Sequence, residues 1–122
     1  MPTEPQPATL AQVVHRASEV VDPEGADRDV SDFFARFEDE DEPVTAVEDV
    51  EERLTEAAGA LDPQEESGPL QVAVAVATYL AHRRDELPEE PDELVRLAVR
   101  AEFEDAPPAP VADWLALNGV DV

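Results

Sequence analysis

The sequence predicts an all-α protein, a single compact domain of about six helices arranged like a bundle around a central apolar helix at residues 70–87. Three observations lead to this prediction. Apolar residues recur every three or four positions along most of the chain, as on one face of a helix. Capping residues, prolines and glycines separate these periodic segments. Residues 70–87 are apolar almost all round, which is typical of a buried helix.

The length of 122 residues suits one domain, and a chain of this size buries about two-thirds of the surface that its unfolded form exposes. Residues 1–8 contain several prolines and show no apolar periodicity. We therefore expect a flexible N-terminal tail at residues 1–8, followed by a single all-helical domain at residues 9–122. No convincing internal repeat or second domain is evident.

The first periodic segment predicts an amphipathic helix. Thr9 and Gln12 have the spacing of a capping box, in which each side chain bonds to the other residue's backbone N–H. Asp22 and Pro23 follow the periodic residues and predict the end of the helix. The apolar stripe between these signals consists of Leu10, Val13, Val14, Ala17, Val20 and Val21.

The second predicted helix is short and rich in phenylalanine, with Asp29 or Ser31 as its expected cap. Its apolar stripe consists of Val30, Phe33, Phe34 and Phe37. Residues 38–42 are five consecutive acids. The C-terminal end of a helix disfavours negative charge, so we expect this acidic run to end the helix and form a mobile, exposed loop. A dedicated calcium site is not expected there, because the run lacks the glycine of a calcium-binding turn.

Three further helices are predicted along the rest of the domain. One begins with a Thr45/Glu48 capping box and ends at Asp62. Another begins at Pro91, which suits a first helical turn. A short helix lies within residues 111–119 and stops at the last two of them, an Asn-Gly pair. We expect the prolines that precede it to form a stiff connection: Pro107, Pro108 and Pro110.

Residues 70–87 require a choice between helix and strand. Val72, Val74 and Val76 alternate with alanine, as in a strand. Alanine is a poor strand former and the apolar segment is long, so we predict a helix. A line of small residues on this helix allows another helix to approach closely: Ala73, Ala77 and Ala81. We expect the helix to be wrapped by the others or shared with a second copy of the chain.

Charge is the strongest compositional signal. The chain has 31 acidic and 8 basic residues, a formal net charge of −23. Two causes compete for this surplus: adaptation to concentrated salt, as in halophilic proteins, or binding to a basic partner. The acids occur in nearly every segment, which favours halophilic adaptation. Non-specific cations are expected at such a surface, and direct nucleic-acid binding is not, because no basic stripe is present.

The sequence lacks cysteine, a recognisable secretory signal and a long apolar segment, and these features bear on its compartment and cofactors. It has no cysteine, and its opening residues lack the basic and apolar regions of a secretory signal. The longest apolar stretch is too short and too interrupted to span a bilayer. We therefore expect a cytoplasmic protein that needs no cofactor and contacts no membrane.

Two His/Glu pairs with helical spacing are the only candidate metal ligands: His15 with Glu19 and His82 with Glu86. Each pair places an imidazole and a carboxylate on the same helix face. Exposed histidines beside abundant acids are the favoured explanation of the pairs, so a metal site is an alternative and not the prediction.

No residue pattern predicts catalysis. The favoured hypothesis is a protein–protein interaction or self-association module, binding another protein or forming a homodimer or larger oligomer. Its expected interaction residues are Phe33, Phe34, Phe37, Ala73, Ala77 and Ala81. The alternative is a metal-binding protein or enzyme that uses the His/Glu pairs. A further alternative is an acidic mimic of nucleic acid, which requires acids arrayed along one face.

Overall fold

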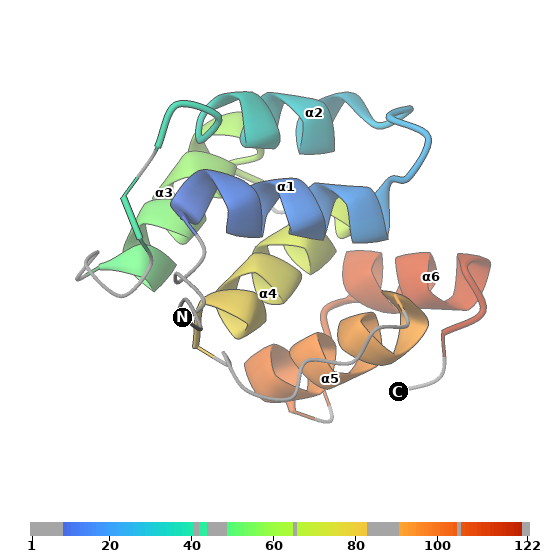
Figure 1. Cartoon of the computed structure of the whole chain (residues 1–122). Coiled ribbons are helices and arrows are strands. Elements are labelled where there is room, and N and C mark those ends of the chain that lie inside the picture. The colour runs from blue at the N-terminus through green and yellow to red at the C-terminus, as the bar shows by residue number, and fades with distance from the viewer. Residues whose placement is uncertain are drawn as a thin grey trace.

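A computed structural model gives the fold of residues 9–40, 42–43, 49–64, 66–82, 91–104 and 106–120, with the backbone alone for residue 82. This described part contains six α-helices and no β-strand beyond an isolated bridge between Thr9 and Pro43. The helices pack extensively on one another (Figure 1), which confirms the prediction of a compact all-α fold. They are α1 (Leu10–Val21), α2 (Arg28–Ala35), α3 (Val50–Leu61), α4 (Gly68–His82), α5 (Pro91–Phe103) and α6 (Ala109–Leu117).

The central helix of the fold is α4, as predicted. It packs against each of the other five helices, which surround it in Figure 1. It begins at Gly68, because the Ser67 hydroxyl accepts a hydrogen bond from the backbone N–H of Leu70 at 3.2 Å and so caps the helix. The last predicted part of this helix, residues 83–87, lies outside the described residues.

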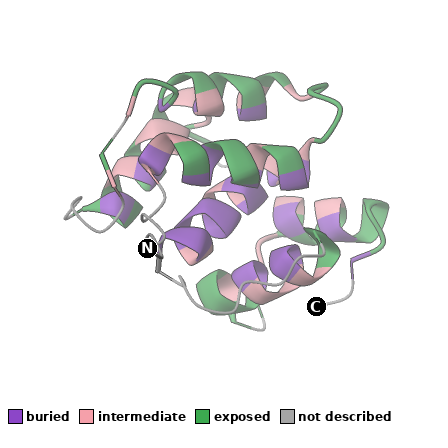
Figure 2. Ribbon diagram, viewed as in Figure 1, coloured by how far each residue is buried: buried purple, intermediate pink, exposed green. Residues whose placement is uncertain are grey.

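Burial follows the apolar pattern of α4. Most of the helix is buried in Figure 2, and residues on different sides of it are inaccessible to solvent. The hydrophobic core gathers around it from all the other helices, with Leu10, Phe33, Leu54, Leu94 and Val111 among its fully buried members. A helix that is apolar almost all round must be covered on several sides to keep its side chains from water.

The cap of α1 agrees with the sequence, whereas the cap of α2 does not. Thr9 and Gln12 form the predicted capping box. The N-cap of α2 is Asp27, whose carboxylate accepts from the N–H of Val30 at 3.0 Å. The expected caps, Asp29 and Ser31, lie inside the helix. Asp27 takes the role because its backbone is still extended, which an N-cap requires.

The same loop design joins α1 to α2 and α3 to α4. Asp22 and Asp62 each end a helix and are followed by proline. The Asp22 carboxylate accepts from the N–H groups of Ala26 and Asp27, at 3.0 and 2.8 Å. The Asp62 carboxylate accepts from the N–H groups four and five residues further on, at 3.1 and 2.8 Å. The two helix–loop–helix connections therefore have the same hydrogen-bonded arrangement. The sequence analysis did not identify this repeat, because the flanking side chains differ.

The acidic run after α2 is bonded to α1 and α3 through Glu40 and Glu42, contacts that the expectation of an exposed loop did not include. The carbonyl oxygens of Glu42 and Glu40 accept from the N–H groups of Leu10 and Ala11, at 3.0 and 3.1 Å. The Glu40 carboxylate also pairs with Arg53 of α3 at 2.8 Å. These backbone carbonyls satisfy N–H groups in the first turn of α1 that have no partner within the helix. The side chains of Glu38, Asp39 and Glu42 are exposed, as expected.

The remaining helix boundaries agree in part with the sequence. The predicted Thr45/Glu48 capping box lies outside the described residues, and Asp49 precedes α3 without a side-chain cap. Pro91 begins α5 as predicted. Pro110 lies in the first turn of α6 and not in the preceding connection, because proline is tolerated where helical N–H groups have no partner. The predicted stop of this helix is confirmed by the positive φ of Gly119.

No helix in the described ranges has the length and apolar character needed to cross a membrane.

Candidate interaction groove

A groove runs along α4 between α3 and α5. It consists of two adjoining hollows of about 170 Å³ and about 340 Å³, which share Ala75 and Glu102 as lining residues. Within the described chain, α3 packs on α2 and α4, and α5 packs on α1 and α4, so α3 and α5 flank α4 without packing extensively on each other. We call this feature the α3–α5 groove. Its apolar lining includes Ala58, Val74, Ala75, Ala101 and Phe103.

The apolar lining of the α3–α5 groove is left partly accessible. Val74 and Phe103 pack against the core but are only half-buried, and Ala101 is exposed. Val74 of α4 lines the smaller hollow together with residues of α3 and α5. The apolar surface that the sequence places all round α4 is therefore buried on most sides and remains accessible along the groove.

Gly59 contributes an unusual feature to this groove. It lies within α3 and is exposed, and a Cβ atom built at this position would meet no atom of the described residues within 4 Å. Glycine inside a helix costs about 0.5–1 kcal/mol relative to alanine. The packing of this chain does not require the absence of a side chain at residue 59. The sequence analysis overlooked Gly59, although a glycine within a helix is a readable signal.

The polar lining of the groove combines acidic residues with uncharged ones such as Thr55 and Gln71. Among the described residues, the charged ones that line it are Glu51, Asp62 and Glu102, and no described arginine or histidine lines either hollow. The Asp62 carboxylate is already held by backbone N–H groups of the following loop. Glu51 and Glu102 are exposed residues at the groove, and Glu102 makes a further interaction within the chain.

Two of the three phenylalanines expected at an interaction surface lie in the core. Phe33 is fully buried and Phe37 is 4% exposed, and their rings meet edge to face with centroids 5.4 Å apart. Phe34 is half-buried and packs against the His15 ring of α1, with ring centroids 5.1 Å apart and the ring planes tilted by 33°. Because Phe33 and Phe34 are adjacent on α2, only one of them can point inward, and Phe34 is the one at the rim.

The small residues of α4 lie in the interior as well. Ala73 and Ala77 are fully buried, and Ala81 is 3% exposed. Helices of the same chain cover all three, so the close approach that these alanines allow takes place inside this fold. None of the three is at the surface of the isolated chain.

The structure brings only part of the candidate metal set together. His15 Nδ1 lies 3.4 Å from Glu19 Oε1, with both side chains more than half exposed. The His82 side chain and Glu86 lie outside the described residues. Within the described residues, no three His, Asp or Glu side chains are grouped to hold a metal ion. A hollow between α1 and α2 adjoins the His15/Glu19 pair, and the buried Ser18 hydroxyl near it has no hydrogen-bond partner in the described structure.

Comparisons with protein-family models, with curated proteins and with solved structures each gave no match. The functional argument therefore comes from the geometry of the chain itself.

Proposed function

We propose that this protein is a non-catalytic protein–protein interaction module that binds a partner in the α3–α5 groove. The observation that carries the proposal is the accessible apolar side of α4, framed by two helices that do not close over it. A partner that covers this side would remove half-exposed apolar side chains from water, which is the main driving force of protein association. Of the residues expected at the interface, only Phe34 is partly accessible, whereas the others are buried in the core: Phe33, Phe37, Ala73, Ala77 and Ala81.

The size of the groove points to a modest affinity. Full burial of a large apolar side chain contributes roughly 1.5–3 kcal/mol, whereas association costs at least about 4 kcal/mol. Val74 and Phe103 are already half-buried, so only part of their contribution remains for binding. A dissociation constant in the micromolar range corresponds to a binding free energy of about −8 kcal/mol. To reach this value, the partner must bury its own apolar side chains in the same groove.

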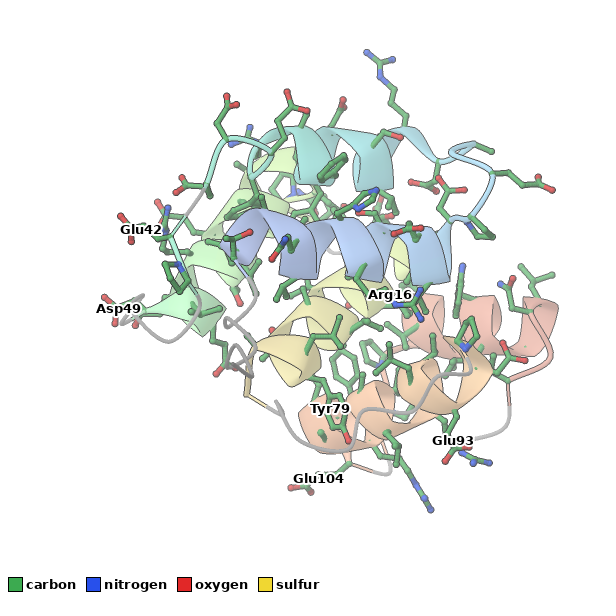
Figure 3. The ribbon with its side chains drawn as sticks, viewed as in Figure 1. Arg16, Glu42, Asp49, Tyr79, Glu93 and Glu104 are labelled. Atoms are coloured by element: carbon green, nitrogen blue, oxygen red, sulfur yellow. The ribbon has the colours of Figure 1, made fainter. Side chains whose placement is uncertain are left out.

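We propose separately that the excess of acidic residues is a halophilic adaptation. Exposed acids occur on α1, α2, α3, α5 and α6. Figure 3 shows labelled acids on different sides of the molecule, with Glu42 and Asp49 at the left, Glu93 at the right and Glu104 at the bottom. A distributed charge of this kind keeps a protein hydrated in concentrated salt. It is less suited to a nucleic-acid mimic, which needs acids in register along one face.

Site-directed photo-crosslinking tests the interaction proposal. A photoreactive amino acid is placed at Thr55 or Ala101, two exposed residues that line the groove, and at Ser31 on α2 as an exposed control. We expect the same crosslinked partner from both groove positions in cells that produce the protein, and not from Ser31. The absence of adducts at the groove positions, or equal labelling from Ser31, would contradict the proposal.

A further inference from the structure

We infer that Asn118 and Gly119 form a self-modification site at the C-terminal end of α6, which the fold keeps inactive until that end opens. In an asparagine–glycine pair the next backbone nitrogen attacks the asparagine amide readily, because glycine has no side chain to obstruct the approach. Asn118 is the only asparagine in the sequence. The inference is independent of the proposed function, because neither residue lines the α3–α5 groove.

The reaction is a deamidation that needs only water. The backbone nitrogen of Gly119 gives up its proton and attacks Cγ of Asn118, and the new N–Cγ bond closes a succinimide ring. The Cγ–Nδ2 bond breaks, and the amide nitrogen leaves as ammonia with that proton. Water then opens the ring at one of its two carbonyl carbons. Opening at Cγ gives aspartate, whereas opening at the main-chain carbonyl gives isoaspartate, in which the main chain runs through the former side chain.

The conformation of the folded chain prevents ring closure. The ψ angle of Asn118 is 5°, so the Gly119 nitrogen nearly eclipses the backbone nitrogen of Asn118. To form the ring it must rotate to the side of the Asn118 Cβ atom. Hydrogen bonds oppose this rotation, because Asn118 Nδ2 donates to the carbonyl of Trp114 at 2.8 Å and the Gly119 N–H donates to the carbonyl of Ala116 at 3.3 Å.

The Gly119 bond belongs to a Schellman motif that ends α6. Gly119 has a φ of 67°, and the N–H of Val120 donates to the carbonyl of Leu115 at 2.9 Å. Val120 and Leu115 are both buried in the core. Rotation at Asn118 would carry Val120 away from Leu115, so deamidation requires this end of α6 to open. Its rate in the folded protein is therefore the rate of the unfolded chain multiplied by the open fraction.

Burial does not protect the amide. Asn118 and Gly119 are exposed, and Asn118 lines a hollow of about 480 Å³ between α6 and the α1–α2 loop. Water therefore has access to the pair in the folded chain. The protection comes from the backbone conformation and its hydrogen bonds, which makes the pair sensitive to local opening of the helix end.

The product would hinder closure of the same helix end. Isoaspartate adds one carbon atom to the main chain before Gly119, which displaces the N–H of Val120 from the carbonyl of Leu115. Either product also replaces the amide that donates to Trp114 with a carboxylate. Negative charge is unfavourable at the C-terminal end of a helix. A transient opening of α6 would thus become a lasting change.

Deamidation of the full chain in its folded and urea-unfolded states tests the inference. Both samples are incubated at the same pH and salt concentration, and cleavage after Arg100 yields the peptide of residues 101–122. Chromatography with mass spectrometry separates its asparagine, aspartate and isoaspartate forms. Asn118→Gln is the chemical control, because its longer side chain must close a larger and less favourable ring.

We expect the unfolded parent to give both acidic products and the folded parent to react at least about tenfold more slowly. Three outcomes would each overturn the inference. They are no reaction above that of Asn118→Gln in the unfolded chain, aspartate without isoaspartate, and equal rates in the folded and unfolded states.

Two variants that retain the asparagine–glycine pair test whether opening of this helix end controls the rate. Val120→Ala removes part of a buried side chain and should speed deamidation of the folded chain at least about threefold. Leu117→Ala, at a side chain that is 86% exposed in the last turn of α6, should leave the rate within about twofold of the parent. Circular dichroism confirms that both are folded, and in urea both should react as the parent does. A folded Val120→Ala that reacts no faster than Leu117→Ala would overturn the inference.

Discussion

Gly68 of α4 lies directly against Pro110 of α6. A Cβ atom at residue 68 would be 2.2 Å from the carbonyl oxygen of Pro110 and 3.1 Å from the Cβ atom of Trp114. The first turns of the two helices are therefore in backbone contact. Gly59 provides the contrast, because a Cβ atom there would touch nothing. One glycine is required by the packing of this chain, and the other is not.

Alanine at these two glycines should change stability in opposite directions. Gly68→Ala forces a Cβ atom into the backbone of α6, which cannot rotate away as a side chain would, and should destabilise the fold by about 1–3 kcal/mol. Gly59→Ala should stabilise it by about 0.5–1 kcal/mol. Urea unfolding monitored by circular dichroism gives both free energies of unfolding. If Gly68→Ala were as stable as the parent, the packing of α4 on α6 would be incorrect.

Asp62→Ala should weaken the junction of α3 and α4. The substitution removes the carboxylate that accepts hydrogen bonds from the N–H groups of Glu66 and Ser67. Both are close to the start of α4, so the free energy of unfolding should fall by about 1–3 kcal/mol. Glu66→Ala, at an exposed side chain in the same loop, is the control and should change it by less than about 0.5 kcal/mol. Equal effects of the two substitutions would show that the Asp62 bonds do not stabilise the loop.

Ala77→Glu should be severely destabilising. Ala77 is fully buried in the central helix, so the new carboxylate would be taken from water without a partner. An uncompensated buried charge costs about 3–5 kcal/mol. Ala60→Glu adds the same charge at an exposed position of α3 and should remain within about 0.5 kcal/mol of the parent. Thermal melting separates the two, and parent-like melting of Ala77→Glu would place α4 at the periphery of the fold.

The Glu40–Arg53 pair should contribute little to stability. The side chains are 34% and 36% exposed, and water and salt screen a pair of this kind. Glu40→Ala should lower the free energy of unfolding by no more than about 1 kcal/mol, because the backbone bond from Ala11 to the Glu40 carbonyl remains. A double-mutant cycle with Arg53→Ala isolates the pair. A coupling energy well above 1 kcal/mol would show that the pair is more desolvated than its exposure indicates.

Folding should depend on salt. With a formal net charge of −23, the chain repels itself, and salt shortens the range of that repulsion from about 30 Å at 0.01 M to about 3 Å at 1 M. Helical signal should fall on dialysis into dilute buffer, and the melting temperature should rise with salt. A melting temperature that hardly changes over this range would remove the main support for halophilic adaptation.

The sequence was most informative where local chemistry and apolar periodicity coincide. The Thr9/Gln12 capping box, the stripe of α1 and the stop at Gly119 were readable because each depends on residues within a few positions of one another. The central place of α4 was readable as well, since a segment that is apolar almost all round has to be covered by others. The cap of α2 was misassigned because Asp27 and Asp29 have the same side chain, and only the backbone conformation distinguishes them.

By itself, the sequence determined the helical class, the identity of the central helix and the strongly acidic character of the chain. The tertiary structure alone decided which apolar surface remains accessible. Phe33, Phe37 and the alanines of α4 are equally apolar in the core or at an interface, and the packing of neighbouring helices buries them. The same packing leaves Val74 and Gly59 beside a groove, because α3 and α5 both rest on α4 without closing over it. Periodicity reports that a face is apolar, whereas its exposure depends on contacts between segments distant in sequence.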